Sequence, residues 1–126
     1  MNPSAVSSPE FPPEPGAVRS ARRWAADHAS VDGPAGETLV LLVSELAANA
    51  VMHARAPFTV TLDREDDHLR VAVSDQGNDL LPEIGDHDPR ATAGRGLRMV
   101  AALASAWGIE TGPRPPTTVW FTLPSS

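Results

Sequence analysis

The segment 37–54 limits the possible folds of this chain more than any other part. Apolar residues recur in it at positions i, i+3, i+4, i+7 and i+11, the spacing that places side chains on one face of an α-helix. Pro57 follows the segment and marks its end. We therefore expect one long helix, packed on a core through a face made of Leu39, Leu42, Val43, Leu46 and Ala50.

Two further amphipathic helices are expected from the same kind of spacing, over residues 17–28 and 97–104. The segment 31–36 reads VDGPAG, and its Asp-Gly and Gly-Pro pairs are typical of a loop. Residues 1–15 are rich in proline and serine, so we expect a disordered tail there. The folded domain would then be 16–126.

Alternation of polar and apolar residues predicts four strands, at 58–63, 69–74, 107–111 and 117–123. Short turns join the first pair and the second pair, so each pair should run antiparallel. The resulting order is helix, helix, strand, strand, long loop, helix, strand, strand. It predicts an α+β fold, a two-layer sandwich with a mostly antiparallel mixed sheet and the helices packed on one face.

The composition narrows the classes of function. The formal net charge is −6, and no cluster of Lys or Arg stands out in the sequence, so no direct nucleic-acid binding is expected. The chain has no cysteine, which excludes thiol catalysis and disulfide scaffolds. No secretory signal and no apolar stretch of about 18 residues is apparent. We therefore expect a cytoplasmic protein without membrane contact.

Three polar residues recur within the apolar helix of segment 37–54. Glu45, Asn49 and His53 are four positions apart, so on a helix they form one stripe at the rim of the core. A carboxylate there can act as a general base, and an amide oxygen can bind a hard cation such as Mg²⁺. The alternative is a solvated helix edge, because polar pairs at this spacing are common.

Two later motifs carry further candidate groups. In VAVSDQGND, Asp75 ends a strand and can accept a hydrogen bond from a ligand amine, or it can form an ordinary Asx turn. In TAGRGLRMVAALA, Gly94 and Gly96 precede a helix, whose N-terminal amides can hold phosphate oxygens beside Arg95. Either motif alone is weak evidence of a site.

Together, the three motifs resemble those of a known superfamily. LLVSELAANAVMHA is similar to the N box of the GHKL ATPases, VAVSDQGND to their first glycine box, and GRGLRMVAALASAWG to their second. The resemblance covers residues 17–123 and implies the Bergerat ATP-binding fold. Within the superfamily, the chain looks most like the small bacterial anti-sigma-factor serine/threonine kinases. That resemblance implies ATP and Mg²⁺ as cofactors, a sigma factor and an anti-sigma-factor antagonist as partners, and a possible homodimer.

The resemblance also implies roles for individual residues. Glu45 would be the catalytic base and Asn49 the Mg²⁺ ligand. Asp75 would recognise the adenine amino group, with Gly77 leaving room for the ring. Thr117 or Thr118, of which we favour Thr118, would support Asp75 through a water. The phosphates would be held by Gly94, Arg95, Gly96 and Leu97, below a short lid formed by residues 78–93.

Two functions follow as hypotheses. In the first, the protein sequesters a sigma factor and phosphorylates a serine of the antagonist. In the second, it is a non-catalytic binding module of the same fold, because Asp79 stands where the first glycine box usually has its second glycine. A third hypothesis, the catalytic half of a two-component histidine kinase, is disfavoured, since no dimerisation helix with a phosphoacceptor histidine is apparent in the sequence. His53 has no role in either hypothesis beyond packing or a hydrogen bond.

Overall fold

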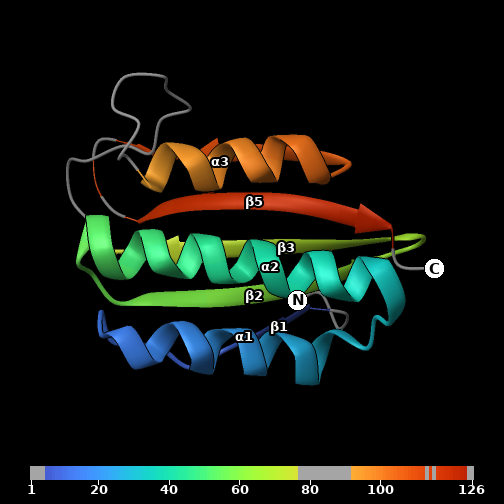
Figure 1. Cartoon of the computed structure of the whole chain (residues 1–126), viewed down its shortest axis with the longest axis horizontal. Helices are drawn as coiled ribbons and strands as arrows, with labels where there is room; N and C mark the ends of the chain where they lie inside the picture. Colours follow the sequence, from blue (N-terminus) through green and yellow to red (C-terminus); the bar gives the residue numbers. More distant parts are fainter. Residues whose placement is uncertain (1–4, 77–91, 113, 115, 125–126) are drawn as a thin grey trace.

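The computed structural model describes residues 5–76, 92–112, 114 and 116–124. It has two layers, in which helices α1, α2 and α3 lie side by side over one face of an open sheet (Figure 1). This arrangement confirms the predicted α+β sandwich. Within the described residues every neighbouring strand pair is antiparallel.

The sheet has five strands in the order β1-β2-β3-β5-β4. β2 and β3 form the first predicted hairpin, and β3 then pairs with β5, so the second hairpin adds to the sheet through its later strand. The strands are β1 (Ala5–Ser7), β2 (Phe58–Glu65), β3 (His68–Asp75), β4 (Ala106–Glu110) and β5 (Thr117–Pro124).

The helices are α1 (Pro15–Ala29), α2 (Gly33–Asn49) and α3 (Thr92–Leu103), with a π-helical turn η1 (Ala50–Ala54) continuing α2. α2 begins inside the segment predicted to be a loop. The reason is Pro34, which lies in the first turn of α2, where the N–H that proline lacks would have no helical partner. The connection between α1 and α2 is therefore much shorter than expected.

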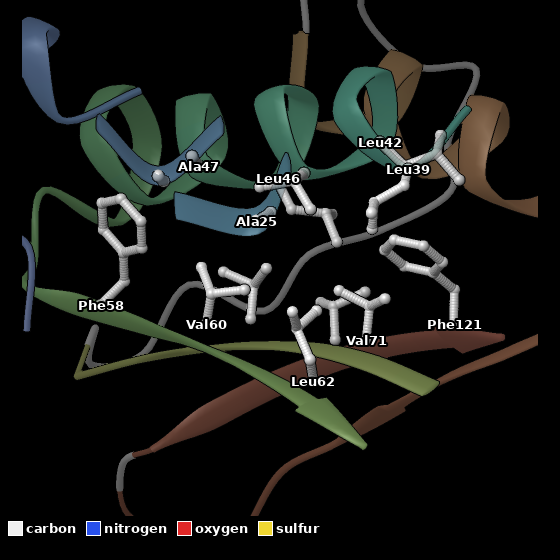
Figure 2. Packing of buried hydrophobic residues seen from close by; sticks show 14 of the residues in the cluster. Ala25, Leu39, Leu42, Leu46, Ala47, Phe58, Val60, Leu62, Val71 and Phe121 are labelled. Carbon is white, nitrogen blue, oxygen red and sulfur yellow. The ribbon is translucent and has the colours of Figure 1, made fainter. Parts of the chain in front are cut away.

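The hydrophobic core lies between the helices and the sheet (Figure 2). α1 contributes an alanine at every fourth position, from Ala17 to Ala29, and these small side chains let it approach closely. α2 contributes larger side chains, which recur every three or four residues along the helix. They pack on alternate residues of β2, β3 and β5, because every second residue of a strand points to the same face. The side chains labelled in Figure 2 include Leu39, Leu42, Leu46, Phe58, Val60, Val71 and Phe121.

The N-terminal segment departs from its prediction as a disordered tail. Residues 5–7 form β1 along the edge of β2, and Ser8 accepts a hydrogen bond from the Val60 N–H at 2.8 Å through its hydroxyl. Phe11 is buried against Phe58, with ring centroids 5.4 Å apart. Prolines are tolerated in such an edge position because only one side of the strand needs donors. The pairing of two phenylalanines supplies the apolar contact that the proline content obscured.

One helical span corrects the expectation that no long apolar stretch exists. Among the described residues, Gly33–Ala54 is long and apolar enough, by length and composition, to cross a membrane, with a mean hydropathy of 1.4. In the fold this span is the central helix, and its leucines pack on the sheet. A core helix can match a membrane span in length and apolar composition, because both keep their apolar side chains away from water.

Candidate functional site

Four elements that carry predicted site residues meet at one end of the domain. α2 ends there, and α3 and β5 begin there (Figure 1). β3 ends at the same place, because Asp75 pairs with Thr117 at the start of β5 and with Phe58 at the start of β2. The topology therefore brings together motifs that are separated by up to about seventy residues in the sequence.

Glu45 and Asn49 lie on the flank of α2 beside the deeply buried leucines, and both are half-buried. This is the position at the rim of the core that the sequence predicts. The Asn49 amide nitrogen Nδ2 is buried and has no hydrogen-bond partner among the residues that the structure describes. A buried donor without a partner costs about 1–3 kcal/mol, so such groups are rare and call for an explanation. A ligand that hydrogen-bonds this amide would remove that cost.

Gly96 of α3 rests directly on this flank of α2. A Cβ atom at Gly96 would lie 3.4 Å from Asn49 Nδ2 and 3.6 Å from the Glu45 carboxylate oxygen Oε2. Leu97, the next residue, is fully buried and anchors α3 to the core. These are ordinary van der Waals distances, so a side chain larger than that of alanine at position 96 would press on Glu45 and Asn49. Sequence reasoning predicted these four residues for one site, and the structure brings them together.

The start of α3 differs from the prediction. The helix begins at Thr92, so Gly94 and Gly96 lie inside it and do not precede it. Only about the first four N–H groups of a helix lack a partner within the helix. The Gly94 N–H belongs to this first turn, as a phosphate-binding amide would. The Gly96 N–H lies beyond it, so the position of Gly96 favours a packing role.

The two threonines at the start of β5 point to opposite sides of the sheet. Thr117 is buried and lies in register with Asp75, on the face that the helices cover. The Thr118 hydroxyl lies 2.8 Å from the Ser74 hydroxyl on the open face. Because neighbouring residues of a strand face opposite sides, Thr117 shares the side of Asp75. The geometry therefore disfavours Thr118, which the sequence analysis favours, as the residue that supports Asp75.

His53 lies in η1, beyond the regular part of the helix, and is half-buried. The π-helical turn was not predicted, since AVMHA contains no glycine or proline that would indicate a change in winding. Turns of this type occur frequently at functional sites. Because the winding of the helix changes after Asn49, His53 does not continue the α-helical stripe of Glu45 and Asn49.

Several predicted residues lie wholly or partly outside this description. Gly77, Asp79 and most of the predicted lid at 78–93 are outside the described residues. Gly94 and Arg95 belong to α3, and only their backbone assignment is described. Among the described side chains, no group of three His, Cys, Asp or Glu residues is placed to hold a metal ion.

Fold and site together define an α+β domain in which an acid and an amide on a central helix face the start of a neighbouring helix. Comparison with known families identifies the class, because residues 11–123 match the histidine kinase-like ATPase domain. The chain belongs to this family. No curated protein matches the sequence.

A solved structure with the same fold contains the RsbU and RsbW domains of Rv1364c from Mycobacterium tuberculosis. It matches with a TM-score of 0.66 and 23% sequence identity. The match covers 94% of this chain but only 31% of that chain. At this level of identity the similarity concerns the fold.

The close approach at Gly96 can be tested by adding a side chain. Gly96→Val would place its methyl groups against Asn49 and Glu45, and we expect it to lower the free energy of unfolding by about 1–3 kcal/mol through overpacking. Gly16→Val is the matched control, since Gly16 lies in α1 and a Cβ atom added there would meet no atom within 4 Å apart from its own turn of helix. Denaturant unfolding measures both. Equal effects of the two substitutions would contradict the close contact.

Proposed function

We propose that this protein binds ATP with Mg²⁺ and transfers the γ-phosphoryl group to a serine of a partner protein. The observation that carries this proposal is the pair formed by Glu45 and Asn49 beneath Gly96. It combines a carboxylate with a buried amide nitrogen that has no partner within the described part of the chain. The chain belongs to the histidine kinase-like ATPase family, which makes a nucleotide the natural ligand of this end of the domain.

Asn49 is the residue proposed to hold Mg²⁺, through its amide oxygen. The donor set fits this ion, because Mg²⁺ usually keeps several waters, takes few protein ligands and completes its shell with substrate phosphates. A larger cluster of carboxylates is therefore not needed. When bound, the ion would supply neutralisation of charge on the phosphates.

Glu45 is the proposed general base. Its carboxylate would accept the proton of the serine hydroxyl as the serine oxygen bonds to the γ-phosphorus. The bond from that phosphorus to the bridging oxygen of ADP breaks, and ADP leaves. Positioning and electrostatic stabilisation supply most of the catalysis in such transfers. A single well-placed base on the rigid helix α2 is consistent with this requirement.

Asp75 and Thr117 are proposed to recognise the adenine ring. A carboxylate at the end of β3 can accept a hydrogen bond from the exocyclic amine. Thr117 replaces Thr118 as the supporting residue in this proposal, because Thr117 lies beside Asp75 on the covered face. The first turn of α3, with Gly94 and Arg95, is proposed to bind phosphate oxygens through backbone amides and charge.

The proposed partners are a sigma factor, which the protein would sequester, and an anti-sigma-factor antagonist, which would be the substrate. Support comes from the resemblance of the three motifs to anti-sigma-factor kinases and from the shared fold with a chain that contains an RsbW domain. A cytoplasmic location and a homodimer belong to the same proposal.

A non-catalytic binding module is the second candidate. Asp79 favours it, since a carboxylate replaces a glycine of the first glycine box and would repel the phosphates if it faced them. The presence of Glu45 favours the kinase, because a protein that only binds needs no base on this flank of α2.

Asn49→Ala separates ligand binding from folding. The wild-type protein should gain roughly 2.7 kcal/mol of stability at a Mg·ATP concentration 100 times the dissociation constant, and the variant should lose this gain. Without nucleotide, the variant should be no less stable than wild type, because the substitution removes a buried unpartnered donor. Thermal unfolding with and without Mg·ATP measures both quantities.

Ser44→Ala is the control on the same helix, since the Ser44 hydroxyl donates to the Val40 carbonyl of the preceding turn, at 2.8 Å. It should keep the stabilisation by Mg·ATP. Full stabilisation of Asn49→Ala by Mg·ATP, together with a large loss of stability without nucleotide, would show that Asn49 is structural.

Glu45→Gln tests phosphoryl transfer. It should retain Mg·ATP binding and lower the transfer rate at least about 100-fold, because general bases typically contribute 10²–10⁴. The measurement is transfer of labelled phosphate from ATP to a candidate antagonist. Glu65→Gln, at an exposed position at the end of β2, should leave the rate unchanged. Saturable binding of antagonist and ATP by wild type without any transfer would decide for the binding module.

A further inference from the structure

A groove between α1 and α2 lies on the side of α2 away from α3. One part is a hollow of about 460 Å³ lined by Arg19, Arg22, Arg23, Ala26 and Val40. A neighbouring hollow of about 500 Å³ is also lined by Ala26 and Val40, and continues to Asp32 and Glu37. The two shared residues make the hollows parts of one groove. It is basic at one end, apolar in the middle and acidic at the other end.

Three arginines concentrate positive charge at the basic end of the groove. Arg19, Arg22 and Arg23 are exposed on one side of α1, although the net charge of the chain is −6. This corrects the expectation that no cationic cluster exists. Like charges three and four residues apart on a helix repel each other and destabilise it. The cluster therefore opposes the stability of α1 when no anion is near.

The arginines of α1 differ from Arg64 and Arg70 in having no partner among the described residues. Within the described residues, none of the three forms an ion pair or a hydrogen bond. In contrast, Arg64 donates to the Ala29 carbonyl at the end of α1, and Arg70 lies over the Trp120 ring and near Glu110. The guanidinium groups at the basic end thus keep their full capacity for carboxylates, which they bind in a fork geometry.

The groove and the proposed nucleotide site lie on opposite sides of one helix. α2 packs against α1 on one side and against α3 on the other (Figure 1). Val40 faces the groove, whereas Glu45 and Asn49 face Gly96 of α3. A molecule in the groove would therefore leave the nucleotide site open.

We propose that the groove between α1 and α2 binds a charge-polarised segment of a partner protein. Its acidic end would meet Arg19, Arg22 and Arg23, an apolar residue would cover Ala26 and Val40, and its basic end would meet Asp32 and Glu37. The charge complementarity at both ends argues for a peptide. A nucleic acid would be repelled by the acidic end, and three arginines are few for a phosphate backbone. Binding here does not depend on the proposed kinase activity.

The test uses the full chain and a synthetic amphipathic peptide with glutamates at one end, leucines in the middle and lysines at the other. Fluorescence anisotropy at low salt should show saturable binding that weakens as salt is added. The double substitution Arg22→Glu and Arg23→Glu should weaken binding at least about tenfold, since several exposed ion pairs are lost and replaced by repulsion. Its thermal stability should not fall, because the substitution removes like-charge repulsion.

Arg114→Glu is the control, since it makes the charge change of one of these two substitutions at an exposed site outside α1. It should leave peptide affinity unchanged. The double variant and Arg114→Glu should both be stabilised by Mg·ATP like wild type. Loss of peptide binding in the groove can therefore be told apart from loss of nucleotide binding. A peptide of the same composition with scrambled charges should bind at least about tenfold more weakly, because it cannot match both ends of the groove.

Three outcomes would overturn the proposal. The first is equal binding of the polarised and scrambled peptides. The second is an equal loss of affinity in Arg114→Glu. The third is a preference for duplex DNA, or for self-association of the chain, over the polarised peptide at the same salt concentration.

Discussion

The packing of α2 on the sheet is the constraint on which the rest of the structure depends. Leu42 and Leu46 are almost completely buried, so the rotation of the helix about its own axis is fixed by the core. That rotation turns Glu45 and Asn49 towards α3 and Val40 towards α1. Both the candidate nucleotide site and the charged groove therefore follow from the way one helix buries its leucines.

The site contains features that a fold optimised only for stability would avoid. Asn49 has a buried amide nitrogen without a partner among the described residues. Gly96 lies inside α3, where glycine costs about 1 kcal/mol relative to alanine. On α1, the exposed arginines repel one another. Departures from local rules are expected at functional sites, and here they lie where two of the helices meet and along the groove beside α1.

The sequence predicted those features that depend on periodicity. The repeats of apolar residues located α2 and strands β2, β3 and β5, and the spacing of Glu45 and Asn49 placed them at the rim of the core. Features that depend on contacts between distant segments were less accessible. Phe11 is held by a partner 47 residues later, Phe58, which no local pattern in a proline-rich segment indicates.

The choice between Thr117 and Thr118 shows the same limit. A shift of one residue in a strand reverses the side to which every residue points. The register of β5 against β3 is set by the whole ladder, so the sequence alone left both threonines open. The three arginines of α1 are likewise present in the sequence. Their position beside a groove depends on how α1 packs against Val40 and Glu37 of α2, which the sequence does not show.

The central claim is that Glu45, Asn49 and the start of α3 form one nucleotide site. The most direct test is a nuclear magnetic resonance titration that follows the Asn49 side-chain amide and the Gly96 backbone amide. On addition of Mg·ATP, both signals should shift together and saturate at the same concentration, while Mg²⁺ alone should leave them unchanged. Saturable shifts confined to other parts of the chain, with Asn49 and Gly96 unmoved, would contradict the account.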